Sequence, residues 1–343
     1  MQYNFSMKIA NCAEIQAYLK RCTDHIYDTR LNAFLHMPVS FKDEPQIQAK
    51  LKAAGAQEFD EKGPSLFLSA KEWENNPYHK LALPNHSRYG NFTFHMETME
   101  GHRLFNADAI RPDKNRELAD WMKLRAMDSD IKALHLYQNK TCWMMNTPAE
   151  AATNDPIAEK AHGNVLTFGL GIGYFTFMAL RNPTVASVTV VERCQEVIDL
   201  FKQVILPHFN VQKPVYILHE DAYQMWKPQI LKAYDTIYAD IWHGGDDGLP
   251  IISRLLEAYN PPLEKTFFWI EDSCIEPLRT QIFLHFEELA RKITIQPHPA
   301  YAIYMQKVRH YFQTISHTVE TVEPLKDFLY DRAIARAILS QRI

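Results

Sequence analysis

Apolar residues follow two different spacings along this chain, and the spacing changes near residue 150. Before that point, a helical spacing over residues 13–23 is followed by short runs at 65–68 and 92–96. In the second run every other residue is apolar, ahead of Gly101, which is typical of a hairpin or meander. Residues 1–150 are therefore predicted to form a mixed α+β domain.

After residue 160, short β-rich runs alternate with segments of helical length. This alternation predicts a mainly parallel sheet with helices on both faces. The expected strands are 164–168, 187–192, 215–219, 236–241 and 266–271. Two helical segments carry apolar residues on one face, which we expect to cover the sheet. These residues are Val197, Ile198, Phe201, Val204 and Ile205 in the first, and Leu278, Ile282, Phe286 and Leu289 in the second.

The same reasoning places helices before and after the sheet. Asp155 followed by Pro156 predicts a helix that begins at this proline and leads into the first strand. Residues 301–315 and 325–339 are predicted to form two terminal helices. The expected division is 1–150, 151–298 and 299–343, with the parallel sheet in the middle unit.

Composition narrows the classes of function. Lys and Arg total 37 against 41 Asp and Glu, so the net charge of -4 favours neither nucleic acid nor an anionic membrane as partner. No run approaches the roughly 20 apolar residues of a membrane helix, and no export signal is expected at the start. The five cysteines are odd in number and form no C-x-x-C pair, which favours reduced thiols in a cytoplasm.

Three alternating glycines follow the first predicted strand of the sheet. Gly169, Gly171 and Gly173 permit a sharp turn and let a ligand approach bare backbone. A dinucleotide loop, G-x-G-x-x-G, would need its third glycine where Tyr174 stands, so NAD is the weaker hypothesis. The alternative without a ligand is a tight strand-to-helix turn.

Acidic residues stand at the ends of the next two strands. Glu192 ends the second strand, where a carboxylate accepts both hydroxyls of a ribose. Asp221 beside Ala222 follows the third strand, where an adenine amino group would be held. Ligands of open α/β sheets bind at the carboxyl ends of the strands, so these features and the glycines predict one adenosine site.

Residues 160–295 resemble the class I S-adenosylmethionine-dependent methyltransferases, on the glycine run, Glu192 and the Asp221-Ala222 pair. The resemblance implies a Rossmann-like fold with S-adenosylmethionine as cofactor. It also implies that the glycines line the methionine part, Glu192 holds the ribose, and Asp221 with Ala222 holds the adenine. That family usually has an acid two residues before the first glycine, where this chain has Thr167.

The segment after the fourth strand carries the candidate catalytic groups. We expect Asp240 at the strand end to face the transferred methyl group, and His243 to act as general base. Asp246 and Asp247 follow on a glycine-containing loop and can converge with them. The alternative for these two acids is a solvated loop with an aspartate that caps the next helix.

Two further acids, Glu271 and Asp272, close the fifth strand and are expected near Asp240. Catechol-type O-methyltransferases are similar here and bind magnesium, with lysine where this chain has His243. Hard oxygen ligands suit magnesium, yet a lone group of acids is more often free of metal. We expect no metal and keep the magnesium site as the alternative.

The sequence thus predicts a methyltransferase acting on a small molecule. Spermidine synthases share the expected fold, although Ile172 stands where they usually carry an aspartate, so aminopropyl transfer is the second hypothesis. A cofactor-binding regulatory protein without chemistry is the third. Trp242 and Tyr174 form either an aromatic wall for the substrate or part of the core.

Overall fold

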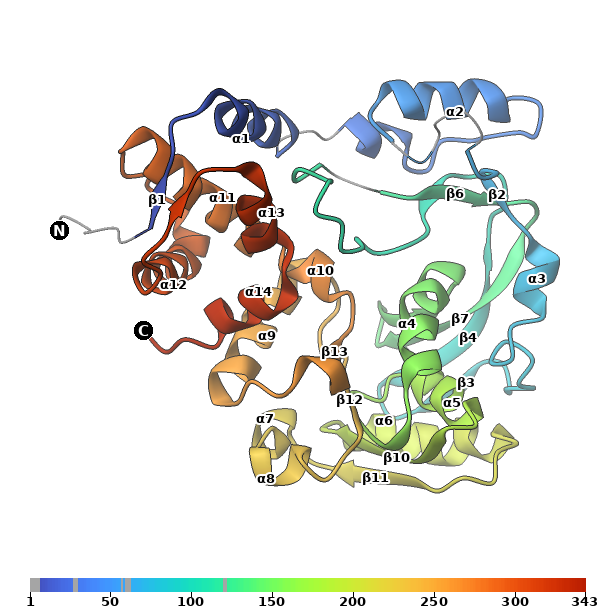
Figure 1. Ribbon diagram of the computed structural model, residues 1–343. Helices are drawn as coiled ribbons and strands as arrows, with labels where there is room; N and C mark the ends of the chain where they lie inside the picture. Colours follow the sequence, from blue (N-terminus) through green and yellow to red (C-terminus); the bar gives the residue numbers. More distant parts are fainter. Residues whose placement is uncertain (1–6, 27–29, 57, 59–62, 120–121) are drawn as a thin grey trace.

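The computed structural model describes residues 7–26, 30–56, 58, 63–119 and 122–343 (Figure 1). Its centre is a sheet of five parallel strands in the order β11-β10-β9-β12-β13. The strands span Gly163–Phe168 (β9), Val185–Glu192 (β10), Val215–His219 (β11), Thr236–Ala239 (β12) and Thr266–Phe268 (β13). The predicted parallel sheet is confirmed.

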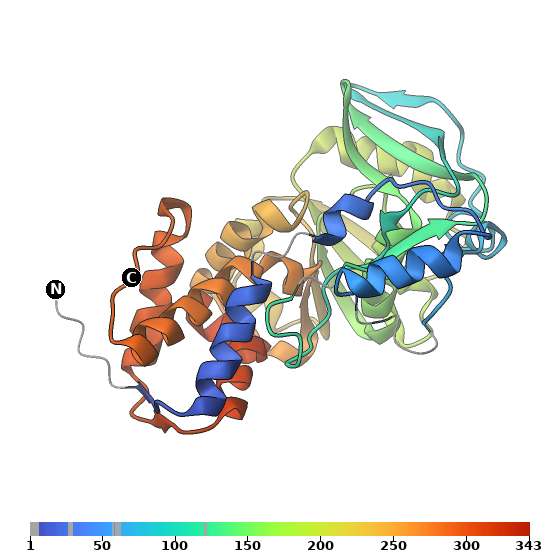
Figure 2. The same ribbon diagram turned by 90° about the horizontal axis from the view of Figure 1, so that it is seen from above.

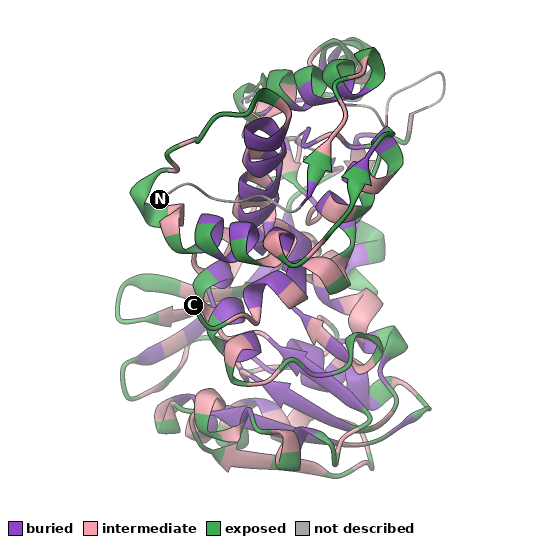
Figure 3. Cartoon of the chain, turned by 60° about the vertical axis from the view of Figure 1, so that its left-hand side comes forward, coloured by how far each residue is buried: buried purple, intermediate pink, exposed green. Residues whose placement is uncertain are grey.

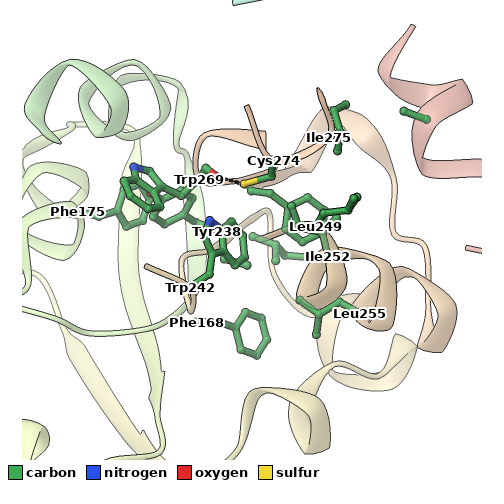
Figure 4. Close-up of a cluster of buried hydrophobic side chains, with 14 of the residues drawn as sticks. Phe168, Phe175, Tyr238, Trp242, Leu249, Ile252, Leu255, Trp269, Cys274 and Ile275 are labelled. Atoms are coloured by element: carbon green, nitrogen blue, oxygen red, sulfur yellow. Dashed lines mark hydrogen bonds between the residues drawn. The ribbon is translucent and has the colours of Figure 1, made fainter. Parts of the chain in front are cut away.

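Helices cover both faces of this sheet. Successive side chains along a strand point to opposite faces, so the apolar strands present apolar side chains to a helix layer on each side. On one face the hydroxyl of Tyr238 in β12 donates to Asn154 of α4, 2.8 Å away. On the other face the Phe168 ring lies 5.2 Å from the Trp226 ring, in an apolar cluster that includes Leu255 of α9 (Figure 4). The strands between these layers are mostly buried (Figure 3). The helices linking the strands are Pro148–Lys160 (α4), Tyr174–Arg181 (α5), Gln195–Leu200 (α6), Ala222–Met225 (α7), Pro228–Leu231 (α8) and Gly245–Ala258 (α9).

Two strand ends differ from the prediction. β12 ends at Ala239 because its neighbour β9 turns away at Gly169, so the last hydrogen bond of this pair joins the Asp240 N–H to the Phe168 carbonyl. β13 ends at Phe268, since Ile270 adopts a left-handed φ of 43° and a short helix, Glu271–Cys274 (α10), begins after it. Glu271 and Asp272 therefore lie in a helix and not at a strand end.

The predicted helix start at Pro156 is also wrong. Helix α4 begins eight residues earlier, with Thr147 as N-cap and Pro148 in its first turn, and Pro156 lies inside it. A proline inside a helix leaves the carbonyl four residues back without its usual donor. Here Ala152 is that residue, and its carbonyl accepts a bond of 3.0 Å from Arg111 instead.

The region before α4 contains the predicted meander and a smaller sheet. The meander is a four-stranded antiparallel sheet in the order β3-β4-β7-β8, and the smaller sheet has the order β2-β6-β5. Helix α2 lies beside the smaller sheet (Figure 2), and a separate apolar cluster fills this unit. The elements are Glu44–Ala53 (α2), Phe67–Leu68 (β2), Ala70–Glu74 (α3), Ser87–Tyr89 (β3), Phe92–Met99 (β4), Phe105–Asn106 (β5), Leu124–Met127 (β6), Ile131–Gln138 (β7) and Thr141–Asn146 (β8).

Segments from the N-terminal and C-terminal regions of the described chain pack together in a helical layer beyond β13. Strand Lys8–Ile9 (β1) pairs with Thr318–Val319 (β14), and helix Ala13–His25 (α1) packs against α11 and α13 (Figure 1). The predicted terminal helices are present, although Asp331 divides the second in two by capping α14. The other members of the layer are Glu276–Arg291 (α11), Ala302–Gln313 (α12), Val322–Tyr330 (α13) and Arg332–Leu339 (α14).

The two predicted apolar helix faces are both buried, but they pack against different elements. The face containing Val197 and Phe201 is buried, and α6 packs on β10 and β11 as predicted. The face containing Leu278 and Phe286 is also buried, but α11 packs chiefly against α1, α12 and α13 instead of the sheet. Periodicity shows which face of a helix is apolar, but not what covers that face. No helix in the described residues has the length and apolar character needed to cross a bilayer.

Candidate functional site

A cavity of about 300 Å³ opens at the carboxyl ends of β9, β10 and β12. The strand order reverses between β9 and β12, because the chain adds β10 and β11 on one side of β9 and then crosses to the other. Open α/β sheets bind their ligands at such a reversal. The lining includes eight of the nine sequence-predicted cofactor and catalytic residues, namely Thr167, Gly169, Gly171, Glu192, Asp221, Ala222, Asp240 and His243.

Protein atoms pack closely against the glycine turn, and Gly169 and Gly171 also line the cavity. Gly169 has φ 95°, and a Cβ there would lie 1.9 Å from the Asp240 carbonyl oxygen. At Gly171 a Cβ would lie 2.1 Å from the sulfur of Met144, which also accepts the Ile172 N–H. Met144 thus occupies space that the sequence assigned to a ligand. Gly173 is the predicted residue outside the lining, and it packs against Phe201.

The N-terminal region holds the start of α5 in place. Tyr174 is buried, and its hydroxyl donates to Asp155 at 2.8 Å while accepting from the Asn76 amide at 2.9 Å. The Tyr78 hydroxyl donates to the Ile172 carbonyl at 2.5 Å. Tyr174 therefore serves both predicted alternatives, because it belongs to the core and also lines the cavity.

Glu192 and Asp221 each make backbone contacts that fix the cavity wall. One oxygen of Glu192 accepts the Leu170 N–H at 3.1 Å and the other accepts the Cys194 N–H at 2.8 Å. Asp221 caps α7 and accepts the Tyr223 N–H at 2.7 Å. A carboxylate oxygen accepts more than one hydrogen bond, so both groups retain capacity for a ligand.

The structure adds a carboxyl group that the sequence reasoning missed. Glu150, in the first turn of α4, lines the cavity together with Asp240. Burial raises the pKa of Glu150 to about 7. Burial, followed by the charge of Glu150, raises the pKa of Asp240 well above its ordinary range. Thr147-Pro148 is a typical helix start with Glu150 three residues after the cap, and this signal could have located it.

His243 occupies a different environment from Asp240. Its side chain is 71% exposed, and its ring Nδ1 lies 3.1 Å from Asp247. Asp247 sits in the first turn of α9 and accepts the backbone N–H groups of His243 and Gly244. Burial opposes ionisation of Asp247, but these hydrogen bonds outweigh it and lower its pKa. The capping role considered for this acid is confirmed, and the neighbouring Asp246 is exposed.

Glu271 and Asp272 do not join Asp240. Glu271 is held by Arg336 through two contacts of 2.7 Å, and Asp272 pairs with Arg279 and Arg332. These arginines come from α11 and α14, so both carboxylates face the helical layer. Within the residues that the structure describes, no three His, Cys, Asp or Glu side chains are arranged to hold a metal ion.

Aromatic side chains close the remaining wall. Trp242 is buried in the apolar cluster of Figure 4. Its ring lies 6.2 Å from that of Phe268, and it also lines the cavity. The ring of Phe175 lies 4.0 Å from that of Tyr238, and the indole N–H of Trp269 donates to Thr153 at 2.9 Å. The cavity therefore combines carboxyl groups with ring faces, which suits a cationic ligand.

No family model and no curated protein matches this chain.

Proposed function

We propose that this chain is a class I S-adenosylmethionine-dependent methyltransferase of Rossmann-like fold that acts on a small molecule. The observation that carries the proposal is the cavity at the reversal of strand order, which gathers the glycine turn, Glu192 and Asp221 at successive strand ends. Their meeting in one cavity supports an adenosine-containing ligand.

The carboxylates of the lining fit such a ligand. Glu192 would accept the ribose hydroxyls, and Asp221 beside Ala222 would lie at the adenine. Six carboxyl groups line the cavity, against Arg193 and His243 as the basic residues of the lining, so its electrostatics favour the positive sulfonium. The lining carboxyls are Glu150, Glu192, Glu220, Asp221, Asp240 and Asp247.

S-adenosylmethionine supplies an electrophilic methyl group when bound. The chain has to place an acceptor against that group, exclude water and take the acceptor's proton. Asp240 suits the last task because it lies at the strand end in the cavity lining, and its raised pKa makes its ionised carboxylate a stronger base. His243 was the sequence-based choice, but its exposed ring bound to Asp247 favours a role at the cavity mouth.

Aminopropyl transfer from decarboxylated S-adenosylmethionine is the second candidate. A methionine carboxylate would need a positive partner, and the basic lining residues are Arg193 and His243, both on loops after the strand ends. The decarboxylated compound has no such group and carries an additional ammonium. The acid-rich lining is the observation that favours it.

Calorimetric titration with both compounds tests the proposal. Glu192→Gln keeps one acceptor oxygen for the wall but loses the charge, so it should weaken either adenosyl compound by about 1.5–3 kcal/mol. Glu264→Gln, on an exposed surface, is the matched control and should bind as the wild type does. Unchanged affinity in a folded Glu192→Gln protein would remove the ribose assignment.

The same titration separates the candidate reactions. Tenfold tighter binding of the decarboxylated compound would favour aminopropyl transfer over methylation. Binding without turnover on any acceptor would favour the regulatory hypothesis. If neither compound binds the wild type, the proposal fails.

A further inference from the structure

Two carboxyl groups of the cavity lining have no basic partner among the described residues. Glu150 comes from the first turn of α4, and Asp240 comes directly after β12. Among the described residues, neither side chain takes part in an ion pair. The interaction that joins them is repulsion between their own charges. An enclosed pair of this kind is costly to ionise unless a cation enters.

The polar groups next to the pair are already bonded to one another. The Tyr238 hydroxyl donates to the side chain of Asn154, and the Asn154 amide donates to the backbone carbonyl of Glu150 at 3.0 Å. The Trp269 indole is bonded to Thr153. These bonds satisfy the neighbouring donors without using the two carboxylates. Both carboxylates therefore remain available to a ligand.

Ring faces complete this part of the cavity. Phe175, Tyr238 and Trp269 all contribute to the lining. Aromatic faces attract cations, and they exclude the water that would otherwise solvate the carboxylates. Among the described residues no three His, Cys, Asp or Glu side chains are arranged to hold a metal ion, and two carboxylates are few ligands for calcium, which takes six to eight oxygens. A primary ammonium has three N–H donors and needs no such shell.

We propose that Glu150 and Asp240 together bind a protonated amine, and that Glu150 is a specificity-determining residue of the cavity. The inference rests on the proposed function, because the amine belongs either to the adenosyl compound or to the acceptor molecule. Asp240 also takes the acceptor's proton in that function. Glu150 is free of such a task, which makes it the residue to change.

The test compares two adenosyl thioethers, one with a methyl group on the sulfur and one with an aminopropyl group. 5′-Methylthioadenosine is uncharged, whereas S-adenosyl-3-thiopropylamine carries a single ammonium on the same adenosine. Glu150→Gln should weaken the amine-bearing compound at least tenfold and change the affinity for 5′-methylthioadenosine less than twofold. Glu159→Gln, exposed on the same helix, should leave both affinities unchanged.

A third ligand identifies the source of the amine. 1,4-Diaminobutane is titrated alone and with saturating 5′-methylthioadenosine. A loss confined to S-adenosyl-3-thiopropylamine assigns the ammonium to the adenosyl compound, and a loss confined to 1,4-diaminobutane assigns it to the acceptor. Asp240→Asn should reproduce the loss if Glu150→Gln does not fold.

The outcomes separate the two proposals. If the adenosyl compounds bind but Glu150→Gln affects them equally or not at all, and diaminobutane binding is also unchanged, the amine site is overturned while the proposed function stands. If no adenosyl compound binds, the proposed function fails. Diaminobutane binding that depends on Glu150 would then still support the amine site, and its absence would overturn that site too.

Discussion

Two pairs of acidic residues lie near the same edge of the parallel sheet, and the protein treats them in opposite ways. Glu271 and Asp272 are buried and held by three arginines of the helical layer. Burial opposes ionisation of Asp272, but the charges of Arg279 and Arg332 outweigh it and lower its pKa. Glu150 and Asp240 line a cavity without basic partners, and their pKa values are raised.

The difference distinguishes a structural group from a ligand-binding group. A buried charge that is paired inside the protein has nothing to gain from a ligand. A carboxyl left unpaired in a cavity costs free energy until a cation binds. Such a group is therefore a candidate for binding or catalysis. The first pair attaches the C-terminal helices to the sheet edge. The second pair belongs to the candidate site.

Removing an arginine that holds the first pair should give the largest effect on stability. Arg336→Met would leave Glu271 buried without its two-contact partner, and removal of one member of a buried ion pair costs about 3–5 kcal/mol. The free energy of unfolding from denaturant titration measures this loss. A cost below about 1 kcal/mol would mean that Arg332 replaces Arg336, and that the pair does not hold the helical layer as argued.

Changing the second pair should reduce activity instead. Asp240→Asn removes the proposed proton acceptor and should lower turnover about 10²- to 10⁴-fold once an acceptor is identified. His243→Ala should cost less than this, because the His243 ring is exposed. Steady-state rates of both variants decide between the two residues. A larger loss in His243→Ala would restore the sequence-based assignment of the base.

Removing the other member of the second pair should stabilise the unliganded protein at alkaline pH. The pKa of Glu150 is about 7 when folded, against an ordinary 4.5, so the folded state holds this proton more tightly. Its contribution to stability is therefore full below pH 4.5 and is lost as pH rises through 7. At pH 8 Glu150→Gln should be more stable than the wild type by about 1–3 kcal/mol.

Unfolding titrations at pH 5 and pH 8 measure this difference. The advantage of Glu150→Gln should shrink at pH 5, and Glu159→Gln should show none at either pH. A Glu150→Gln protein that is less stable than the wild type at pH 8 would show that the carboxyl is paired after all.

Removing one member of an exposed ion pair should have the smallest effect on stability. Arg21 and Glu117 lie 2.9 Å apart, with the Arg21 side chain 51% exposed. Solvent screens such pairs, so Arg21→Met should cost about 1 kcal/mol or less. The same denaturant titration measures it. A loss as large as that of Arg336→Met would mean that burial is not what separates the two cases.

Patterns of local sequence predicted the sheet and most of the cavity. Alternating strands and helices fixed the parallel strands, and residues at successive strand ends necessarily meet at one edge. Thr167, Glu192 and Asp221 could therefore be placed together from their positions alone.

Local sequence patterns could not predict where some side chains point or which distant segments reach the site. Glu271 and Asp272 follow β13, but the left-handed turn at Ile270 directs them to arginines more distant in the sequence. Glu150 precedes the first strand of the sheet, and the misplaced helix start at Pro156 left it outside the predicted helix. Met144 reaches the glycine turn from a strand of another sheet, which no spacing along the chain predicts.

Proton release on binding tests the central contrast most directly. Calorimetric titration of S-adenosyl-3-thiopropylamine at pH 7, in two buffers of different ionisation enthalpy, counts the protons that leave the protein. An ammonium entering between Glu150 and Asp240 should expel at least about half a proton from the wild type, and clearly less from Glu150→Gln. Tight binding to the wild type with no proton release would contradict the account.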